Sequence, residues 1–315
     1  MKKYDVQPLQ SWGSLPVNLK PKWVSLGCDK RVYKIAISDR DLAECHNSNS
    51  SDLPLIAIMT ATSSRGVKYP STKSLSLFTT FLPSLAKTLD CGFQYVYVMG
   101  YDVGDAYYDS DAGLNETVKW FEDNIKSVLF KNTIEINLLL VKVDNVLKKP
   151  GPVFLKIAKV AYDYGVHYFY RVNDDTELIN RWPDIFVNAL KSLPLQVGII
   201  GPMCKQGNVA ILTHDFVHRT HMQIFEMNYY PPELVDWWMD DWMTTVYGIN
   251  RTLQSKTVHV IHHESHGKRY DVELSNYKKL KKLVLAGRRN ISAWMSKFNI
   301  VEQFDDINFS GFRTF

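Results

Sequence analysis

The 315-residue sequence lacks both glycine-rich signatures of nucleotide-binding α/β proteins. No GxGxxG follows its first predicted buried strand, and GxxxxGK[ST] occurs nowhere. Their absence excludes a Rossmann-type dinucleotide site and a P-loop. A phosphate-bearing ligand must therefore be held by other groups.

Cysteine is scarce and dispersed, and long apolar runs are missing. The four cysteines, Cys28, Cys45, Cys91 and Cys204, contain no CxxC pair. This spacing excludes a zinc motif and a dense disulfide framework, so reduced thiols in a cytosolic setting are the expectation. No apolar run reaches the ~18–20 residues of a membrane span, and Met1-Lys2-Lys3 precedes no apolar signal core. We therefore expect a soluble, cytoplasmic protein.

The chain also lacks a strong excess of one charge. Its net charge is +4, with 45% hydrophobic and 22% charged residues. This balance indicates a folded globular protein with a mild preference for anionic ligands, and it argues against a dedicated nucleic-acid binder. Basic residues gather only near the C-terminus, in a predicted amphipathic helix over 276–296. Such a helix is most often a solvated face, and the alternative is a peripheral contact with a membrane surface or a polyanion.

From Leu53 onward the sequence alternates between apolar strands and amphipathic helices. Strands are predicted at 55–59, 94–99, 134–143, 168–172, 196–200 and 257–261, and helices at 72–89, 115–130, 153–164 and 181–193. Residues 1–52 are irregular and rich in proline and serine, and are predicted to be an extension with edge strands at 23–26 and 32–37. This order predicts an α/β fold.

The most informative stretch is YFYRVNDDTE, from Tyr168 to Glu177. An apolar strand ends abruptly in Asn173, Asp174 and Asp175. Ligands of open α/β sheets bind at the carboxyl ends of the strands. Adjacent carboxylates there repel each other unless a cation compensates them, which indicates a Mg²⁺ or Mn²⁺ site serving a phosphate-bearing substrate. An Asp-rich turn that caps the following helix is an equally good interpretation.

Two later stretches supply further candidates. In WWMDDW, Asp240 and Asp241 lie ~100° apart on a helix, so that only one can face a cleft. Trp237 and Trp238 are either core residues or a platform for a sugar ring. In HHESHGKRY, the histidines follow a strand and could complete a metal shell, while Lys268 and Arg269 could meet a diphosphate.

In their order and spacing, these motifs resemble the GT-A glycosyltransferases, which use nucleotide sugars. NDDTELIN looks like the DDDT segment of fringe and β1,3-galactosyltransferase-type enzymes, and DDWMTTVYG looks like their later acidic motif. The chain also looks like sugar-transferring enzymes of large algal viruses, some of which attach xylose. The resemblance covers about 53–270, and it implies a nucleotide-binding half over 53–176, an acceptor half over 177–270 and a C-terminal basic helix and tail over 271–315.

The resemblance implies a role for several of the candidate residues. Asp175 would hold Mn²⁺ or Mg²⁺ together with His263 or His266, and Asp241 would be the catalytic base. Asn173 and Asp174 would lie near the ribose and the sugar. Independently of the resemblance, Trp237, Trp238 and Asp240 are the candidate acceptor contacts, because an exposed Trp near a carboxylate can pack against a sugar ring. Further nucleotide contacts match the family by position alone: Thr60, Thr62, Arg65 and Asp102. Lys268 and Arg269 are candidates through their positive charge.

The resulting hypothesis is an inverting, metal-dependent transfer from a nucleotide sugar, such as a UDP-sugar or UDP-xylose, to a glycan or glycoprotein hydroxyl. Two alternatives remain open. One is a metal-dependent nuclease or phosphohydrolase, which would need more converging carboxylates around paired metals. The other is a non-catalytic carbohydrate-binding protein that uses the aromatic stretch 229–242.

Overall fold

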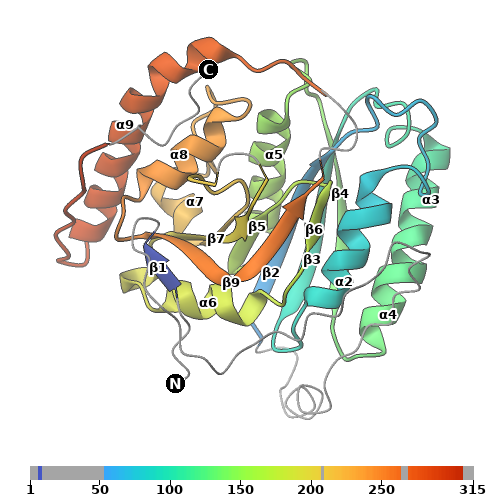
Figure 1. Ribbon diagram of the computed structural model, residues 1–315, viewed down its shortest axis with the longest axis horizontal. Coiled ribbons are helices and arrows are strands. Elements are labelled where there is room, and N and C mark those ends of the chain that lie inside the picture. The colour runs from blue at the N-terminus through green and yellow to red at the C-terminus, as the bar shows by residue number, and fades with distance from the viewer. Residues whose placement is uncertain (1–5, 9–52, 207–208, 264–268, 308–315) are drawn as a thin grey trace.

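One curved sheet runs through the molecule. The computed structural model describes residues 6–8, 53–206, 209–263 and 269–307. Within these ranges nine strands form a single sheet, in the order β1-β9-β7-β8-β5-β2-β3-β4, with β6 paired to β9 (Figure 1). Their bounds are β1 Val6–Pro8, β2 Leu55–Thr62, β3 Gln94–Asp102, β4 Ile136–Val143, β5 Tyr168–Arg171, β6 Thr176–Leu178, β7 Ile199–Cys204, β8 Asp215–His218 and β9 Thr252–His262.

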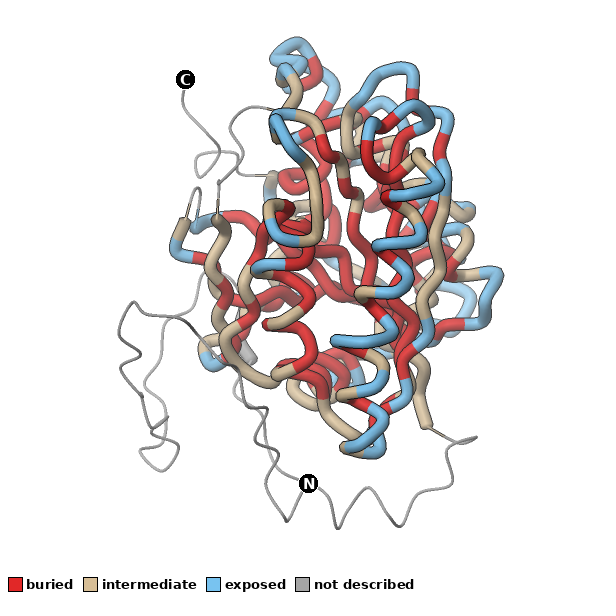
Figure 2. Tube along the Cα trace, turned by 90° about the vertical axis from the view of Figure 1, so that its right-hand side faces the viewer, coloured by how far each residue is buried: buried red, intermediate tan, exposed pale blue. Residues whose placement is uncertain are grey.

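Successive residues of the central strand β2 face opposite sides of the sheet. Ile56 and Ile58 belong to one buried cluster, and Ala57 and Met59 belong to another. Because side chains alternate along a strand, a strand that is apolar at every position needs helices on both faces. Figure 2 shows the result, with buried segments in the interior and exposed ones on the outer surfaces.

Each face of the sheet has its own set of helices. The first face is covered by η2 Leu77–Phe81, α2 Leu82–Thr88, α3 Asp111–Phe121, η3 Glu122–Lys126, α4 Ser127–Phe130 and α6 Pro183–Lys191. The second face is covered by α5 Pro150–Asp163, α7 Thr220–Ile224, α8 Trp238–Val246 and α9 Tyr277–Ser296. Two short helical turns, η4 Pro194–Gln196 and η5 Leu274–Asn276, complete the helical elements of the described ranges.

The strand order reverses between β2 and β5. From β2 the chain moves outward to β3 and then β4, all parallel, and it returns through α5 to β5 on the other side of β2. Beyond β5 the pairing is mixed, with β8 antiparallel to both β5 and β7, and β9 parallel to β7. The segments that follow β2 and β5 both line a cavity at this reversal, at the carboxyl ends of the strands, where ligands of open α/β sheets bind.

The predicted α/β fold class is confirmed, and the strands form one mixed sheet. The parallel pairing is concentrated in the half built from β2 to β5. The predicted strand over 196–200 was misplaced, because Pro194–Gln196 forms a helical turn and β7 starts at Ile199. The predicted helix over 72–89 starts later, with a π-helical turn at Leu77.

The basic helix predicted over 276–296 is confirmed as α9, whereas the N-terminal part and the cysteines differ from expectation. The edge strands predicted at 23–26 and 32–37 lie outside the described residues, whereas Val6–Pro8 pairs antiparallel with β9. The expectation of reduced cysteines is wrong for Cys91, which is disulfide-bonded, while Cys204 is free and buried. None of the helices in the described ranges is both long and apolar enough to cross a bilayer.

Candidate functional site

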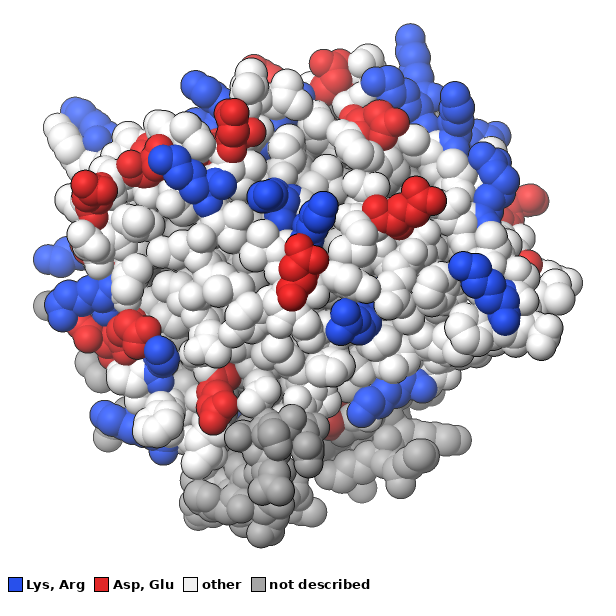
Figure 3. Space-filling model, turned by 180° about the vertical axis from the view of Figure 1, so that it is seen from behind, with Lys and Arg blue, Asp and Glu red and all other residues white. Residues whose placement is uncertain are grey.

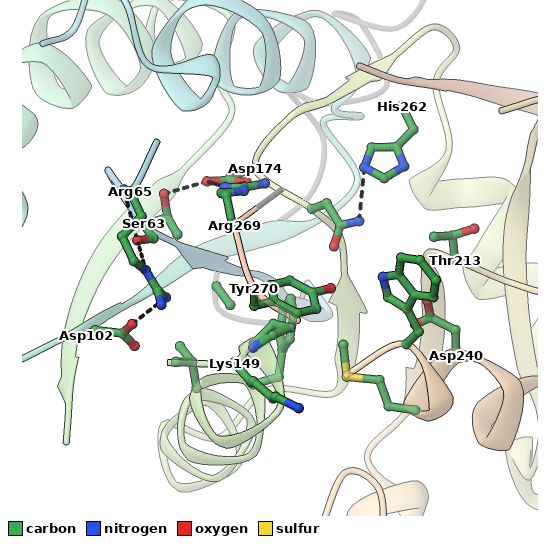
Figure 4. A pocket seen from close by; sticks show the side chains of 18 of the residues that line it. Ser63, Arg65, Asp102, Lys149, Asp174, Thr213, Asp240, His262, Arg269 and Tyr270 are labelled. Carbon is green, nitrogen blue, oxygen red and sulfur yellow. Dashed lines mark hydrogen bonds and ion pairs between the residues drawn. The ribbon is translucent and has the colours of Figure 1, made fainter. Parts of the chain in front are cut away.

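A cavity of about 380 Å³ lies at the reversal point of the strand order (Figure 4). Its walls come from the carboxyl ends of β2, β3 and β9, from the segments that follow β2, β5 and β9, and from the starts of α5 and α8. Of the predicted site residues, the cavity is lined by Thr62, Arg65, Asp102, Asn173, Asp174, Trp237, Asp240 and Arg269. Residues far apart in the sequence are thus brought together, but the predicted metal ligand Asp175 and the predicted base Asp241 do not line the cavity.

One end of the cavity is organised around Asp102, the last residue of β3. Its carboxylate accepts hydrogen bonds from Arg65 Nη2 at 2.7 Å and from Asn145 Nδ2 at 2.8 Å. Burial raises the pKa of Asp102, and these donors counteract part of that shift. Arg65 also donates through Nε to Ser63 Oγ at 2.9 Å. This end therefore presents a carboxylate and a guanidinium in fixed orientations.

The turn after β2 is held by a second carboxylate. Asp105 accepts hydrogen bonds from the Ser63 hydroxyl and from both the backbone N–H and the hydroxyl of Ser64, at 2.7–3.0 Å. It also accepts from the backbone N–H groups of Tyr107 and Tyr108. Asp105 therefore ties the loop after β2 to the loop after β3 and so fixes the position of Arg65.

The two aspartates that follow β5 share one guanidinium. Arg269 Nη1 lies 2.9 and 3.0 Å from the two oxygens of Asp174, and its Nη2 lies 3.1 Å from Asp175 Oδ2. Thr62 Oγ1 donates to Asp174 Oδ2 at 2.7 Å. Burial raises the pKa of Asp174 despite Arg269. Burial also acts on Asp175, but the contact with His262 and the charge of Arg269 outweigh it and lower the pKa of that carboxyl.

His262 is the histidine that reaches the acidic pair. Its Nε2 lies 3.0 Å from Asp175 Oδ1, and the Asn173 amide lies 3.4 Å from the same ring nitrogen. The predicted ligand His263 points elsewhere, since its Nε2 lies 2.9 Å from Glu177 Oε2, in a small separate cavity. Neighbouring residues of an extended segment face opposite sides, which explains the difference. His266 and Lys268, also predicted, lie outside the described residues.

The donor set around Asp175 fits a hard divalent cation only in part. Among the described residues, no three His, Cys, Asp or Glu side chains form a complete metal cluster. Asp175 and His262 nevertheless present a carboxylate oxygen and an imidazole nitrogen 3.0 Å apart beside the cavity. Mg²⁺ is usually bound by one or two carboxylates together with water and substrate phosphates, and Mn²⁺ accepts similar ligands. This pair therefore fits a cation that takes its remaining ligands from a diphosphate.

The opposite wall presents Asp240, which is held by a buried arginine. Arg171 Nη2 lies 2.8 Å from Asp240 Oδ1, and the same guanidinium binds Asp215 through Nε and Nη2. Asp215 also accepts a hydrogen bond from the Tyr229 hydroxyl at 2.6 Å. Burial lowers the pKa of Arg171, but the charges of Asp215 and Asp240 outweigh it and raise that pKa overall. Asp240 therefore faces the cavity with a fixed cationic partner.

Asp241, the predicted catalytic base, does not line this cavity. Its side chain is fully buried, whereas Asp240 is 5% exposed and forms part of the cavity wall. The two residues sit in the first turn of α8, where each residue rotates the side chain by ~100°. The sequence pattern allowed one of them to face the cleft, and the structure places Asp240 there.

The aromatic residues divide in the same way. Trp237 is 36% exposed and lines the cavity, so it can contact a ligand. Trp238, also predicted to meet the acceptor, is 2% exposed; its indole N–H donates to Glu273 O and its ring packs against Tyr277. The prediction for Trp238 is therefore wrong.

Thr60 is another predicted contact that proves structural. It is fully buried and hydrogen-bonded to the Tyr97 hydroxyl, because β2 extends to Thr62 and keeps Thr60 inside the sheet. Among the predicted residues of the loop after β2, Thr62 and Arg65 reach the cavity.

The sequence interpretation missed several cavity residues. Lys149 and Tyr270 line the wall near Asp240, and Lys149 Nζ lies 3.0 Å from the buried Asp236. The start of α5 and the loop before α8 touch closely, since a Cβ on Gly151 would lie 2.6 Å from Val235 Cα. No local pattern signals this contact, because the two segments are about 85 positions apart. For His262, the side-chain alternation along β9 was a usable signal.

Comparisons with known proteins add little to this geometry. No family model matches the chain, and no curated protein matches it. Among solved structures, S. aureus TarS is similar at 13% identity, over 78% of this chain and 44% of that chain, with a TM-score of 0.43. Residues 1–349 of TarS in complex with UDP-GlcNAc are similar at 14% identity, over 74% and 66% of the two chains, with a TM-score of 0.44. The chain thus spans less than half of the longer TarS chain, and at these values the likeness supports no statement about function.

Proposed function

We propose that this protein is a metal-dependent glycosyltransferase of the GT-A type, which moves a sugar from a nucleotide sugar to a hydroxyl acceptor. The observation that carries the proposal is the single cavity at the reversal of the strand order. One wall of this cavity is formed by the segment after β5, where the polar side chains could accept a cation. The opposite wall carries the Asp240 carboxylate and the accessible Trp237. Donor, cation and acceptor would each find suitable groups in one space.

The donor nucleotide would lie along the carboxyl ends of β2, β3 and β5. Asp102 and Arg65 offer an acceptor and a donor of hydrogen bonds for a nucleobase, and Asn173 and Asp174 stand where a ribose would follow. Arg269 and Lys149 bring positive charge toward a diphosphate. The resemblance of the motifs favours UDP as the nucleotide, and the hint of xylose rests on that resemblance alone.

Asp175 and His262 would hold the Mn²⁺ or Mg²⁺ ion. When bound, such an ion neutralises the charge that develops on a departing nucleoside diphosphate. The chain's own part is to orient its ligands: the backbone N–H of His263 donates to the Asp175 carbonyl at 2.9 Å, which fixes the end of β9 beside the acidic pair.

Asp240 is the candidate general base. A carboxylate on the wall opposite the donor can take the proton from an acceptor hydroxyl as that hydroxyl attacks the anomeric carbon. Attack from the side opposite the leaving diphosphate gives inversion of configuration. Arg171 orients the Asp240 carboxylate through the 2.8 Å contact. Trp237 is placed to pack against the acceptor, a glycan or glycoprotein sugar.

The two alternative functions fit the described residues less well. A two-metal nuclease or phosphohydrolase needs several carboxylates around paired ions, and no cluster of three metal-binding side chains occurs in the described ranges. A carbohydrate-binding surface needs exposed aromatic rings, but in the stretch 229–242 Tyr229, Tyr230, Trp238 and Trp242 are all buried.

The test is a donor screen with a defined control. The protein is incubated with Mn²⁺ and a panel of UDP- and GDP-sugars, with and without sugar acceptors, and the released nucleoside diphosphate is measured. We expect one donor to be consumed, with loss of activity in EDTA and in an Asp240→Asn variant. NMR of the product's anomeric proton reports inversion or retention. Cleavage of DNA or simple phosphoesters, or glycan binding without turnover, would contradict the proposal.

A further inference from the structure

Helix α9 carries an unusual concentration of positive charge. Its twenty residues, Tyr277–Ser296, contain four lysines and two arginines and no acidic residue. The inner side is apolar and packs on the second face of the sheet, with Leu280, Val284, Ile291 and Met295 buried. The need for a packed helix explains this inner side, but it does not explain the charge of the outer side.

The outer side forms a narrow stripe, which we define as Lys278, Lys281, Lys282, Leu285 and Arg289. All five side chains are exposed. At ~100° per residue they fall within about 100° of one another around the helix axis, and they extend over about 17 Å. Seen from behind, Lys and Arg side chains line the edge of the molecule on the side where α9 lies (Figure 3).

Exposed apolar side chains accompany the charges. Leu285 lies within the stripe and is 43% exposed, and Tyr277, at the start of the helix, is 48% exposed. Leu274, one turn earlier, is 54% exposed. A polyanion such as a nucleic acid would gain from the lysines but not from these apolar groups. The headgroup region of an anionic bilayer accommodates both, and clusters of four to eight Lys or Arg on an amphipathic helix typically bind acidic lipids.

We propose that the outer stripe of α9 docks the protein on an anionic membrane surface, by electrostatic attraction with shallow apolar contacts. This inference does not depend on the proposed transferase activity. The helix would lie flat on the surface without inserting, because its apolar side is already packed in the core.

Lys278 and Lys282 are the best residues for the test. Asp305 and Asp306 line a groove beside the helix together with Lys281 and Arg289, so their negative charge offsets part of that flank. Lys278 and Lys282 stand outside this groove, one helical turn apart. A matched control is available on α5, where Lys156 and Lys159 are likewise exposed.

The experiment is co-sedimentation of the full chain with vesicles of phosphatidylcholine alone or mixed with phosphatidylglycerol. We expect binding to the mixed vesicles only, with an affinity that falls as NaCl is added. The Lys278→Gln/Lys282→Gln variant should bind about 30-fold more weakly, at about fivefold per charge, while Lys156→Gln/Lys159→Gln should bind as the wild type does. Thermal melting of each variant confirms that it is folded.

Three results would overturn the inference. Equal binding to neutral and mixed vesicles would remove the role of charge. Equal losses in the α9 and α5 variants would show a dependence on overall charge and not on the stripe. Binding to double-stranded DNA or heparin at least as tight as to the mixed vesicles, with the same sensitivity to the α9 variant, would assign the stripe to a soluble polyanion.

Discussion

The two acidic pairs of the cavity, Asp174–Asp175 and Asp240–Asp241, are adjacent in sequence but differ in their use. The first pair follows a strand, and although Asp174 alone of the two lines the cavity, both carboxylates meet the same guanidinium of Arg269. The second pair lies on a helix, and Asp240 alone belongs to the cavity wall. Two adjacent carboxylates therefore share one cation where a turn follows the strand, whereas on the helix one carboxylate faces the cavity and the other is fully buried.

The basic partners of the two acidic pairs also differ in how easily a ligand could replace them. Arg269 and His262 are both 19% exposed at the side chain, so a ligand could replace their contacts with Asp174 and Asp175. Arg171 is 1% exposed and is fixed by Asp215. The first wall is thus suited to exchange one partner for a cation or a diphosphate, while the second is suited to keep one carboxylate in place throughout a reaction.

The largest expected effect concerns the choice between Asp240 and Asp241. The Asp240→Asn variant should lower the rate of sugar transfer by roughly 10²- to 10⁴-fold, because a general base contributes about that much. Binding of the donor, measured by calorimetry, should change little, since the proposed donor contacts lie on the other wall. Asp241→Asn, assayed as folded protein, should retain far more activity. A larger loss of activity in Asp241→Asn than in Asp240→Asn would indicate that Asp241 is the base and would contradict the assignment of Asp240.

The second prediction concerns Arg171, the buried partner of Asp240, and its contribution to stability. Arg171→Met should lower the free energy of unfolding by about 3–5 kcal/mol, because it leaves buried carboxylates without their cation. Urea unfolding provides the measurement. Arg65→Met breaks an ion pair whose arginine side chain is 32% exposed, and should cost much less. Similar losses in both variants would mean that the burial of Arg171 does not make its ion pairs more important for stability than the partly exposed pair of Arg65.

The sequence predicts those parts of the site that depend on neighbouring residues, and it does not predict those that depend on residues far away in the chain. The strand that ends in Asn173, Asp174 and Asp175 is recognisable because apolarity and a polar turn are local features. Choosing between Asp240 and Asp241, or between His262 and His263, requires the direction of a side chain. That direction is set by packing against segments far away in the chain. The sequence therefore indicated that only one of the two aspartates faces the cleft, and the structure shows that Asp240 lines the cavity and Asp241 does not.

The network behind Asp240 was not predictable at all. Arg171 lies within an apparently apolar strand, and its partner Asp215 lies 44 positions later on a strand that pairs with it. Nothing local distinguishes a buried arginine of this kind from an exposed one at a strand end. The paired register of β5 and β8 brings the two charges together, and that register is a property of the whole sheet.

The third prediction concerns the pH dependence of stability, through His221, which contacts Tyr229 of this network. His221 Nε2 lies 2.6 Å from the Tyr229 carbonyl, and burial lowers the pKa of His221 from 6.5 to about 4. As the pH falls below 6.5, the unfolded chain gains a proton that the folded protein does not take up. Stability is therefore lost between pH 6.5 and about 4, by about 3 kcal/mol from this residue. Urea unfolding across this range should show a shallower loss for His221→Gln, and an equal slope would contradict the assignment.

The smallest effect tests whether the first wall exchanges its partner for a cation. His262→Gln should weaken Mn²⁺ binding in the presence of UDP by at least about tenfold, because it removes the imidazole nitrogen that faces Asp175. His263→Gln is the matched control, since His263 contacts Glu177 in a different cavity. Calorimetric titration with Mn²⁺ measures both variants without any need for turnover. If His263→Gln weakened binding as much as His262→Gln, Asp175 and His262 alone could not hold the cation. The opposite directions of the two histidine side chains would then not decide which of them binds it.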